Sequence, residues 1–248
     1  MAGIGSARAE ARILWEHARG NPAAFSICVQ RRLSREPIAY IVGRREFWSL
    51  DFEVGPGVLI PRPETETLMD QALREWHDRS CRYRILDLGI GSGCLLTALL
   101  KEYSQATGVG VDASECALQW ARRNVRNHGL EARVELLNID WNSVGGSFDF
   151  IVCNPPYIRT AHLAGLAPDV RDYEPIMALD GGKDGLAGYR NLSPTLVRCL
   201  KPNGTGFIEI GAGQEEPVSA IMTGGGLTVL RSASDLAGIP RCLVVCRS

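Results

Sequence analysis

One short stretch combines chemically useful groups in an unusual order. The residues Asn154, Pro155, Pro156 and Tyr157 directly follow an apolar run that is typical of a buried strand. Neither proline can donate a backbone hydrogen bond, so the pair stiffens the chain where it leaves the strand. The Asn154 side-chain oxygen and the Pro155 carbonyl can each accept one hydrogen of a planar NH2 group, and Tyr157 can offer a flat ring face. The pattern predicts a clamp that aims such a nitrogen at an electrophile by orientation and electrostatics, without a strong base.

A glycine-rich turn forms a second candidate site, in the stretch RILDLGIGSGCLL. Gly89, Gly91 and Gly93 let the backbone approach a ligand closely, and the helix start that follows favours an anionic group. Asp87 precedes them, which gives D-x-G-x-G-x-G rather than the dinucleotide fingerprint. Asp112 ends the next expected strand, where an acid can bind both hydroxyls of a ribose. An amino-acid moiety on a nucleoside matches these groups, so the pattern predicts S-adenosylmethionine.

The stretch NIDWN closes the third expected strand and adds two candidate donor contacts. Asp140 is placed near an adenine amino group, and Trp141 beside the adenine ring. A rim aromatic that only packs is the alternative interpretation of Trp141. The predicted clamp leaves the methyl acceptor open, because adenine, cytosine, guanine and glutamine all carry an NH2 group of this kind.

These segments need a scaffold that brings them to one edge. From residue 83 onward, strand patterns alternate with helical patterns, which is typical of a parallel sheet with crossover helices. We expect strands over 84–89, 107–112, 134–140, 148–153, 205–211, 227–232 and 241–246. We expect helices over 94–103, 114–128 and 186–200. The last two strands are joined by a short turn. The predicted fold class is therefore α/β, a seven-stranded, mostly parallel, Rossmann-like methyltransferase sheet with an antiparallel last strand.

A small helical segment and a β-hairpin are predicted ahead of the sheet. Ser6 can cap a helix that runs to about Arg19, and apolar residues recur at helical spacing from Phe25 to Leu33. Two short strands are expected around Gly55-Pro56-Gly57. We expect three parts: a helical substrate-docking segment (1–45), a β-hairpin linker (46–63) and an S-adenosylmethionine-dependent methyltransferase domain (64–248).

The composition narrows the classes of function. Lys plus Arg number 27 and Asp plus Glu 28, so no overall positive field attracts nucleic acid. The first fifty residues hold eight arginines and four glutamates, a modest local bias of +4. The cysteines and histidines show no metal-ligand spacing, so we predict no metal site. We see no signal segment and no apolar run of membrane-spanning length, and we expect a cytoplasmic protein without a membrane partner.

The sequence resembles the release factor glutamine methyltransferase family, PrmC/HemK, over nearly its whole length. The matching stretches are REPIAYIVGRREFW, VLIPRPETE, DLGIGSG, NPPYI, YEPIMALDGGKDGLAGYRNL, GFIEIGAGQ and DLAGIPR. Two features depart from the family pattern: the helical N-terminal segment is shorter than usual, and Ile90 and Cys94 stand where Thr and Ala are more common.

The resemblance implies methylation of the side-chain amide nitrogen (N5) of the glutamine in the Gly-Gly-Gln motif of class-one peptide chain release factors. It implies that the amide is held by Asn154, Pro155, Pro156 and Tyr157. It implies methyl-donor contacts from Thr65, Gly89, Ile90, Gly91, Ser92, Gly93, Asp112, Asp140, Trp141 and Asn154, with Pro61 also lining the pocket. The alternatives are an amino-methyltransferase acting on a nucleobase, one acting on an amide of a small metabolite, and a non-catalytic sensor of S-adenosylmethionine.

Overall fold

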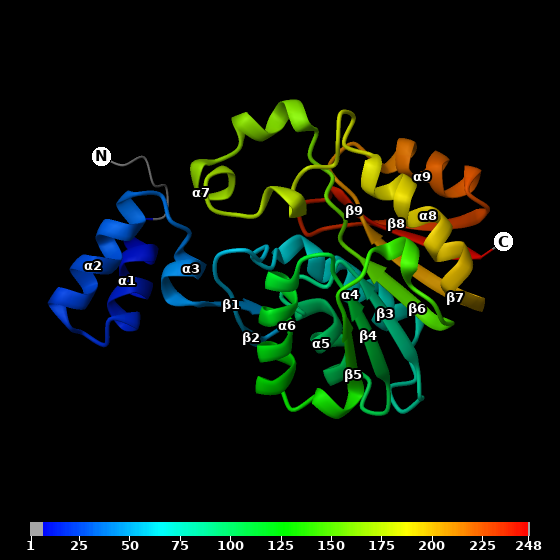
Figure 1. Cartoon of the computed structure of the whole chain (residues 1–248), viewed down its shortest axis with the longest axis horizontal. Coiled ribbons are helices and arrows are strands. Elements are labelled where there is room, and N and C mark those ends of the chain that lie inside the picture. Colours follow the sequence, from blue (N-terminus) through cyan, green and yellow to red (C-terminus); the bar gives the residue numbers. More distant parts are fainter. Residues whose placement is uncertain (1–6, 248) are drawn as a thin grey trace.

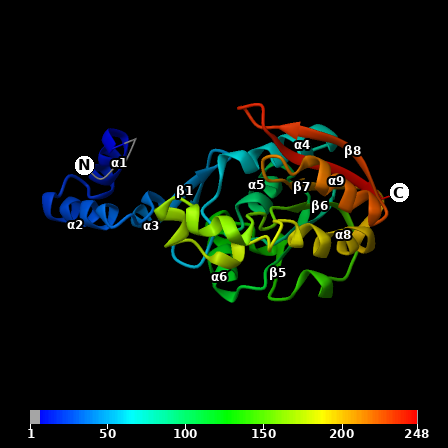
Figure 2. The same ribbon diagram turned by 90° about the horizontal axis from the view of Figure 1, so that it is seen from above.

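The computed structural model describes residues 7–247, which form a helical N-terminal segment and a large α/β domain (Figure 1). The helical segment consists of α1 (Ala7–His17), α2 (Pro22–Leu33) and α3 (Ile38–Val42). Leu14, Cys28 and Ile41 form its small core. Both ribbon views show this segment projecting to one side of the sheet (Figure 2). The two predicted helices are therefore confirmed, whereas the predicted Ser6 cap lies outside the described residues.

The β-hairpin lies earlier in the chain than predicted. Strand β1 (Arg44–Phe47) pairs antiparallel with β2 (Leu50–Glu53), so the turn is Trp48-Ser49 and the prediction of a turn at Gly55-Pro56-Gly57 is wrong. Trp48 and Ser49 have φ of 52° and 57°, a conformation that costs free energy without glycine. The Trp48 N–H donates to Glu66 at 2.8 Å and its indole Nε1 donates to Glu102 at 2.8 Å. These tertiary hydrogen bonds offset the strain of the turn, and no local pattern reveals them.

The Gly-Pro-Gly stretch instead allows the chain to approach helix α6 (Glu115–Asn127) closely. A Cβ atom on Gly55 would lie 2.5 Å from the Trp120 ring. The Trp120 indole donates to the Pro56 carbonyl at 3.3 Å. Gly55 is thus required by packing between two segments rather than by a hairpin turn.

The seven-stranded sheet has the strand order β5-β4-β3-β6-β7-β9-β8. The strands are β3 (Arg84–Leu88), β4 (Thr107–Val111), β5 (Val134–Leu137), β6 (Phe148–Cys153), β7 (Leu200–Glu209), β8 (Leu227–Ser234) and β9 (Pro240–Arg247). Strands β3 to β7 pair in parallel, whereas β9 pairs antiparallel with both β7 and β8. The predicted fold class and the terminal hairpin are both confirmed.

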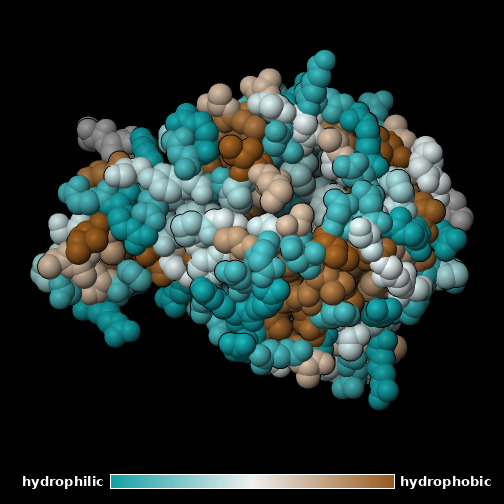
Figure 3. Space-filling model, in the orientation of Figure 1, coloured by the Kyte–Doolittle hydropathy of each residue, from teal (hydrophilic) through white to brown (hydrophobic). Residues whose placement is uncertain are grey.

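Helices cover both faces of the sheet, and alternate strand residues supply the two cores. The remaining helices are α4 (Glu66–Glu75), α5 (Cys94–Glu102), α7 (Pro168–Arg171), α8 (Ala187–Cys199) and α9 (Glu215–Gly224). Phe150 and Val152 of β6 join the cluster under α4, α5 and α6. Ile151 and Cys153 join the opposite cluster under α8 and α9. The hydrophilic outer face of α6 is visible in Figure 3.

Helix α9 was not predicted from the sequence, although Val218 and Met222 have helical spacing and are buried. Pro217 near its start and Gly224 at its end leave an apolar repeat that is too short to predict a helix from periodicity. Five 3-10 turns lie in the connections of the described chain: η1 (Pro63–Thr65), η2 (Glu131–Arg133), η3 (Trp141–Ser143), η4 (Thr160–Gly165) and η5 (Ile176–Ala178). Between residues 7 and 247, no helix is both long enough and apolar enough to cross a membrane.

Candidate active site

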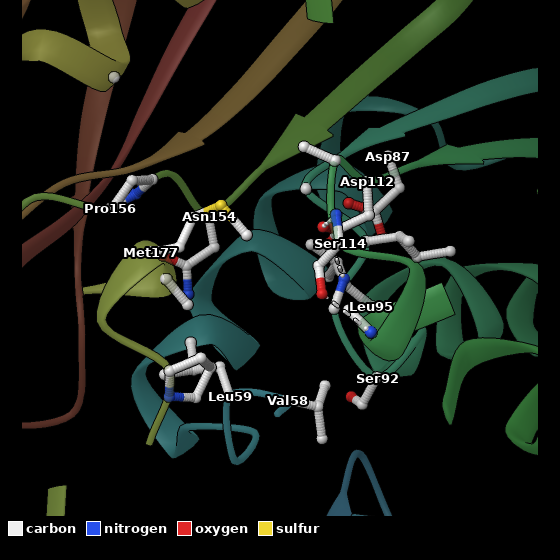
Figure 4. A pocket seen from close by; sticks show the side chains of 18 of the residues that line it. Val58, Leu59, Asp87, Ser92, Leu95, Asp112, Ser114, Asn154, Pro156 and Met177 are labelled. Carbon is white, nitrogen blue, oxygen red and sulfur yellow. Dashed lines mark hydrogen bonds between the residues drawn. The ribbon is translucent and has the colours of Figure 1, made fainter. Parts of the chain in front are cut away.

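A cavity of about 360 Å³ lies at the carboxyl ends of the parallel strands. Strands β3 and β6 are neighbours, and the chain runs outward from them in both directions, which is the position where open α/β sheets bind ligands. We call the part beside the turn after β3 the glycine end (Gly89, Gly91, Asp112, Trp141) and the part beside the loop after β6 the asparagine end (Thr65, Asn154, Pro156). Figure 4 shows Asp87, Asp112 and Ser114 on one side of the cavity and Asn154, Pro156 and Met177 on the other.

The glycine end is shaped by a turn that only glycine accommodates easily. Gly89 has φ +77°, and a Cβ atom there would lie 3.3 Å from the Trp141 ring. The indole of Trp141 is thus held beside the bare backbone of the turn, and both residues line the cavity. The Trp141 ring can lie this close to the turn only because position 89 has no side chain.

Asp112 connects the glycine turn to the start of helix α6. Its Oδ2 accepts the Gly91 N–H at 3.0 Å, and its Oδ1 accepts the Ser114 N–H at 2.9 Å. Burial raises the pKa of Asp112, and these two hydrogen bonds oppose that rise. Each carboxylate oxygen keeps a further lone pair, so the side chain can also accept from a ligand hydroxyl.

Asp87 is a buried acid with an unused acceptor. The residue is 2% exposed, and its Oδ2 has no hydrogen-bond partner among the described residues. Burial raises its pKa to about 7, the backbone N–H of Leu96 opposes this, and the Asp112 charge adds to it. A cationic ligand group would satisfy the orphaned oxygen and favour the ionised form.

Asp140 and Trp141 follow β5 and line the same cavity. The Asp140 carboxylate caps the turn η3 by accepting the Asn142 N–H at 2.8 Å. The charged residues that line the cavity are Arg62, Asp87, Asp112, Asp140 and Asp180. Four acids against one arginine favour a cationic ligand and disfavour a phosphate-rich one.

The asparagine end is built from side chains that come from distant segments. Asn154 Nδ2 donates to Thr65 Oγ1 at 3.2 Å, and Thr65 Oγ1 donates to the Glu209 carboxylate at 2.6 Å. The lining beside it is apolar, because Pro175, Met177 and Ala178 line the cavity and Met177 is 61% exposed. This end can therefore receive an uncharged polar group that enters past an apolar rim.

Comparison with known proteins identifies the family. Residues 65–166 match the Methyltransferase small domain. The release factor glutamine methyltransferase of Caulobacter vibrioides is 45% identical over 217 residues, covering 87% of this chain and 75% of that protein. The protein of the same name from Rhodospirillum rubrum is 40% identical over 265 residues, covering 100% of this chain and 81% of that protein. The chain belongs to the release factor glutamine methyltransferase family.

Solved structures agree with this assignment at the level of the fold. A ribosomal protein L11 methylase from Lactobacillus delbrueckii aligns with TM-score 0.56 and 19% identity, covering 79% of this chain and 84% of that one. A magnesium protoporphyrin IX methyltransferase from Synechocystis, with S-adenosylmethionine bound, aligns with TM-score 0.52 and 14% identity over 74% of this chain and 79% of that one. At these identities the alignments show a shared Rossmann-like methyltransferase architecture.

The residues of this family member fit S-adenosylmethionine. The orphaned Asp87 oxygen and the excess of acids suit the cationic amino-acid and sulfonium groups of that molecule. Asp112 keeps acceptor capacity for ribose hydroxyls, and Trp141 supplies an aromatic ring to the lining of the cavity, as an adenine requires. Between residues 7 and 247 there is no cluster of His, Cys, Asp or Glu side chains that could hold a metal ion.

Most predicted site residues meet at the cavity. The lining contains Thr65, Gly89, Ile90, Gly91, Ser92, Asp112, Asp140, Trp141, Asn154 and Pro156, together with Pro61. The other three predicted residues are Gly93, Pro155 and Tyr157, which are not part of the lining. A Cβ atom on Gly93 would lie 3.4 Å from Ala121 of α6, so Gly93 is placed for packing. The ligand contacts assigned to all these residues stay predictions.

Tyr157 is held both by its hydroxyl and by its backbone, and the predicted contact of its ring face with a substrate stays a prediction. Its hydroxyl donates to Glu209 Oε1 at 3.4 Å, and burial raises its pKa. Its carbonyl accepts from Gln214 Nε2 at 3.0 Å, and the same Nε2 also donates to the Gly185 carbonyl at 3.1 Å. Gln214 Oε1 in turn accepts from the Gly211 N–H at 3.0 Å. Gln214 thus ties the loop after β6 to two other loops of the site.

The sequence reasoning missed the buried acids that support the site. Glu209 is fully buried, and Glu174 is 4% exposed. Glu174 accepts the Ile60 N–H at 3.1 Å and the Arg62 guanidinium at 2.6 Å, which holds the loop that forms one wall of the cavity. An acid inside the apolar run GFIEI is the one local signal that pointed to Glu209.

Two basic residues of the N-terminal segment, Arg31 and Arg32, are paired with acids within the protein. Arg31 forms an ion pair with Glu36, and Arg32 donates to Glu10 at 2.8 Å and is 9% exposed. Arg32 also lies 3.6 Å from Asp169, which anchors the segment near α7. These two arginines stabilise the segment and do not form a free cationic surface. The docking role of residues 1–45 and the division of the chain into three parts stay predictions.

Proposed function

We propose that this protein transfers a methyl group from S-adenosylmethionine to the N5 nitrogen of the glutamine in the Gly-Gly-Gln motif of class-one peptide chain release factors. The observation that carries the proposal is an asparagine amide held at the cavity by a buried hydrogen-bond chain, within a release factor glutamine methyltransferase sequence. A glutamine side-chain amide is uncharged and planar, as the asparagine end requires.

The reaction requires a positioned nitrogen more than a strong base. Bound S-adenosylmethionine supplies an electrophilic methyl group on a sulfonium sulfur. Asp87, Asp112 and Trp141 would hold that molecule at the glycine end. Asn154 Oδ1 and the Pro155 carbonyl would accept the two hydrogens of the glutamine amide, which orients its nitrogen toward the methyl group. The nitrogen becomes acidic once methylated, so it can lose a proton to water.

The acidic lining supports a protein substrate over a nucleic acid. Phosphate groups would meet four aspartates and one arginine around the cavity, and phosphate contacts dominate affinity for nucleic acids. A release factor segment with two glycines before the glutamine is slender enough to pass the apolar side chains of Pro175, Met177 and Ala178 that line the cavity. We also propose that the protein acts in the cytoplasm, where translation terminates.

A direct assay tests the proposal. The purified protein is incubated with labelled S-adenosylmethionine and, in parallel, with a class-one release factor, the same factor carrying Gln→Ala in its Gly-Gly-Gln motif, total RNA, DNA and free glutamine. Mass spectrometry should find one methyl group on the motif glutamine and none in the other arms. Methylation of nucleic acid or of free glutamine, with none on the factor, would overturn the proposed substrate.

A further inference from the structure

The side chain of Asn154 is the last member of a hydrogen-bond chain that starts at a buried carboxylate. Thr65 Oγ1 lies 2.6 Å from Glu209 Oε2, and Asn154 Nδ2 lies 3.2 Å from Thr65 Oγ1. Thr65 is 4% exposed and Glu209 is 0% exposed. Thr65 ends the turn η1, Asn154 follows β6, and Glu209 ends β7, so three distant segments meet in this chain.

The direction of the chain follows from the number of available hydrogens. An ionised carboxylate can only accept, and a threonine hydroxyl has a single hydrogen to donate. Because Thr65 donates that hydrogen to Glu209, its oxygen can only accept from Asn154. The amide nitrogen of Asn154 must therefore face Thr65. Among the described residues none donates to Asn154 Oδ1, and Asn154 lines the cavity.

We propose that Glu209 is a positioning residue for the methylation: acting through Thr65, it determines which way round the Asn154 amide lies, so that Oδ1 stays available to accept from the substrate NH2. The inference rests on the proposed function, because only a substrate with NH2 hydrogens needs an acceptor at this place. An inverted Asn154 would present its own NH2 to the substrate NH2, and two donors cannot pair.

The protonation state of Glu209 decides whether the hydrogen bonds from Asn154 to Thr65 and from Thr65 to Glu209 keep their direction. The titratable and charged groups that act on Glu209 are Arg241, Tyr157, Glu64, Cys153, Cys242 and Tyr189. Tyr157 donates to Oε1, and Arg241 also pairs with Asp235 at 3.0 Å, so neither fully offsets the burial of the carboxylate. Burial raises the pKa of Glu209 to about 7. A protonated Glu209 can donate to Thr65, which frees the Thr65 hydrogen for Asn154 and permits inversion.

The wild-type enzyme and Glu209→Gln test this directly. At saturating donor and release factor, kcat of the wild type should fall as the pH decreases through about 7. Glu209→Gln, which can donate an N–H to Thr65 at every pH, should lower kcat at pH 8 by at least about tenfold, because an oriented acceptor is lost. The variant should lose the acid limb of the kcat profile, while calorimetry shows unchanged affinity for S-adenosylmethionine.

Variants of Thr65 separate the chain from a general packing effect. Thr65→Val removes the link with little change of shape and should reproduce the low kcat. Thr65→Ser keeps the hydroxyl, so its kcat should be close to that of the wild type. The double variant Thr65→Val with Glu209→Gln should be no slower than either single variant, since both break the same chain. Asp149→Asn is a matched control: Asp149 pairs with Lys201 at 2.8 Å near the start of β6, at the opposite edge of the sheet, and its loss should leave kcat unchanged.

A substrate-free measurement keeps this inference distinct from the proposed function. In 15N-labelled wild type, the Asn154 side-chain NH2 signals should shift with pH through about 7, and they should not do so in Glu209→Gln or Thr65→Val. If these signals titrate while the release factor is not methylated, the proposed substrate is wrong, but the orientation of the Asn154 amide by Glu209 stands. A folded Glu209→Gln with wild-type kcat, or Asn154 signals indifferent to pH, would overturn the positioning role.

Discussion

The glycine end and the asparagine end of the cavity are built in different ways. At the glycine end, Asp112 accepts from Gly91 and Ser114, which lie in or beside the turns after β3 and β4. At the asparagine end, Asn154 depends on Thr65 and Glu209, which lie 89 and more than fifty positions away in the chain. The first end joins the turns after the adjacent strands β3, β4 and β5, and the second needs η1 to meet the ends of β6 and β7. Changes at the glycine end should therefore weaken donor binding, and changes at the asparagine end should slow turnover.

The largest effect is expected from Asn154→Ala. Loss of one preorganised hydrogen-bonding group of this kind typically costs roughly 10²–10³ in rate. The single-turnover rate on the release factor should fall by that factor, whereas calorimetric titration should show nearly unchanged donor affinity. Asn127→Ala on the exposed face of α6 serves as the control. A near wild-type rate for Asn154→Ala would show that the asparagine end does not control turnover.

Asp112→Ala should have the converse effect. Removing a carboxylate that accepts from a ligand costs about 1.5–3 kcal/mol, which corresponds to an affinity loss of tenfold or more. The Kd for S-adenosylmethionine should rise accordingly, while kcat at saturating donor changes little. Equilibrium titration measures the first and initial rates measure the second. An unchanged Kd would mean that Asp112 serves only the Gly91 and Ser114 hydrogen bonds.

Asp87→Asn should weaken donor binding and stabilise the fold at the same time. The pKa of Asp87 rises from 3.8 to about 7 on folding, so its contribution to stability is present at low pH and is lost as the pH rises through about 7. At pH 8 the neutral variant should therefore raise the free energy of unfolding by on the order of 1–3 kcal/mol. Denaturant titration at pH 5 and pH 8 should show the gain mainly at pH 8. A gain of equal size at both values would contradict burial of an ionised acid as its cause.

Gly93→Ala should have the smallest effect. Gly93 has φ +80°, and its added Cβ atom would lie 3.4 Å from Ala121. The left-handed conformation alone should cost about 1–2 kcal/mol of stability. Thermal unfolding should register this loss, and donor affinity should stay near that of the wild type. A large loss of donor affinity without loss of stability would instead indicate that Gly93 contacts the ligand.

The sequence was informative wherever a structure depends on neighbouring residues. The strand predicted over 148–153 coincides with β6 (Phe148–Cys153), and the helix predicted over 94–103 is α5 (Cys94–Glu102). The glycine turn and Asp112 lie where the pattern indicated, because a strand, a tight turn and a helix start are written in consecutive residues. The position of Asn154 at the cavity followed from the rule that parallel strands deliver their carboxyl ends to one edge.

Other features were decided only by tertiary structure. The hairpin turns at Trp48-Ser49, because Glu66 and Glu102 offer hydrogen bonds to Trp48 that a local reading cannot supply. Helix α9 is stabilised because Val218 and Met222 pack into the hydrophobic core. Arg32 does not present its charge to a substrate, because Glu10 and Asp169 reach it.

The same distinction applies to the chemistry of the site. The sequence by itself determined the α/β class, the glycine turn with its acids, and an asparagine-proline-proline-tyrosine loop after a buried strand. Tertiary structure decided that Thr65 and Glu209 stand behind Asn154, that Tyr157 donates to Glu209, and that Gln214 joins three loops. The physical reason is that strands, helices and turns are selected by short-range sterics and periodicity. The partners of a buried polar side chain depend instead on which distant segments meet.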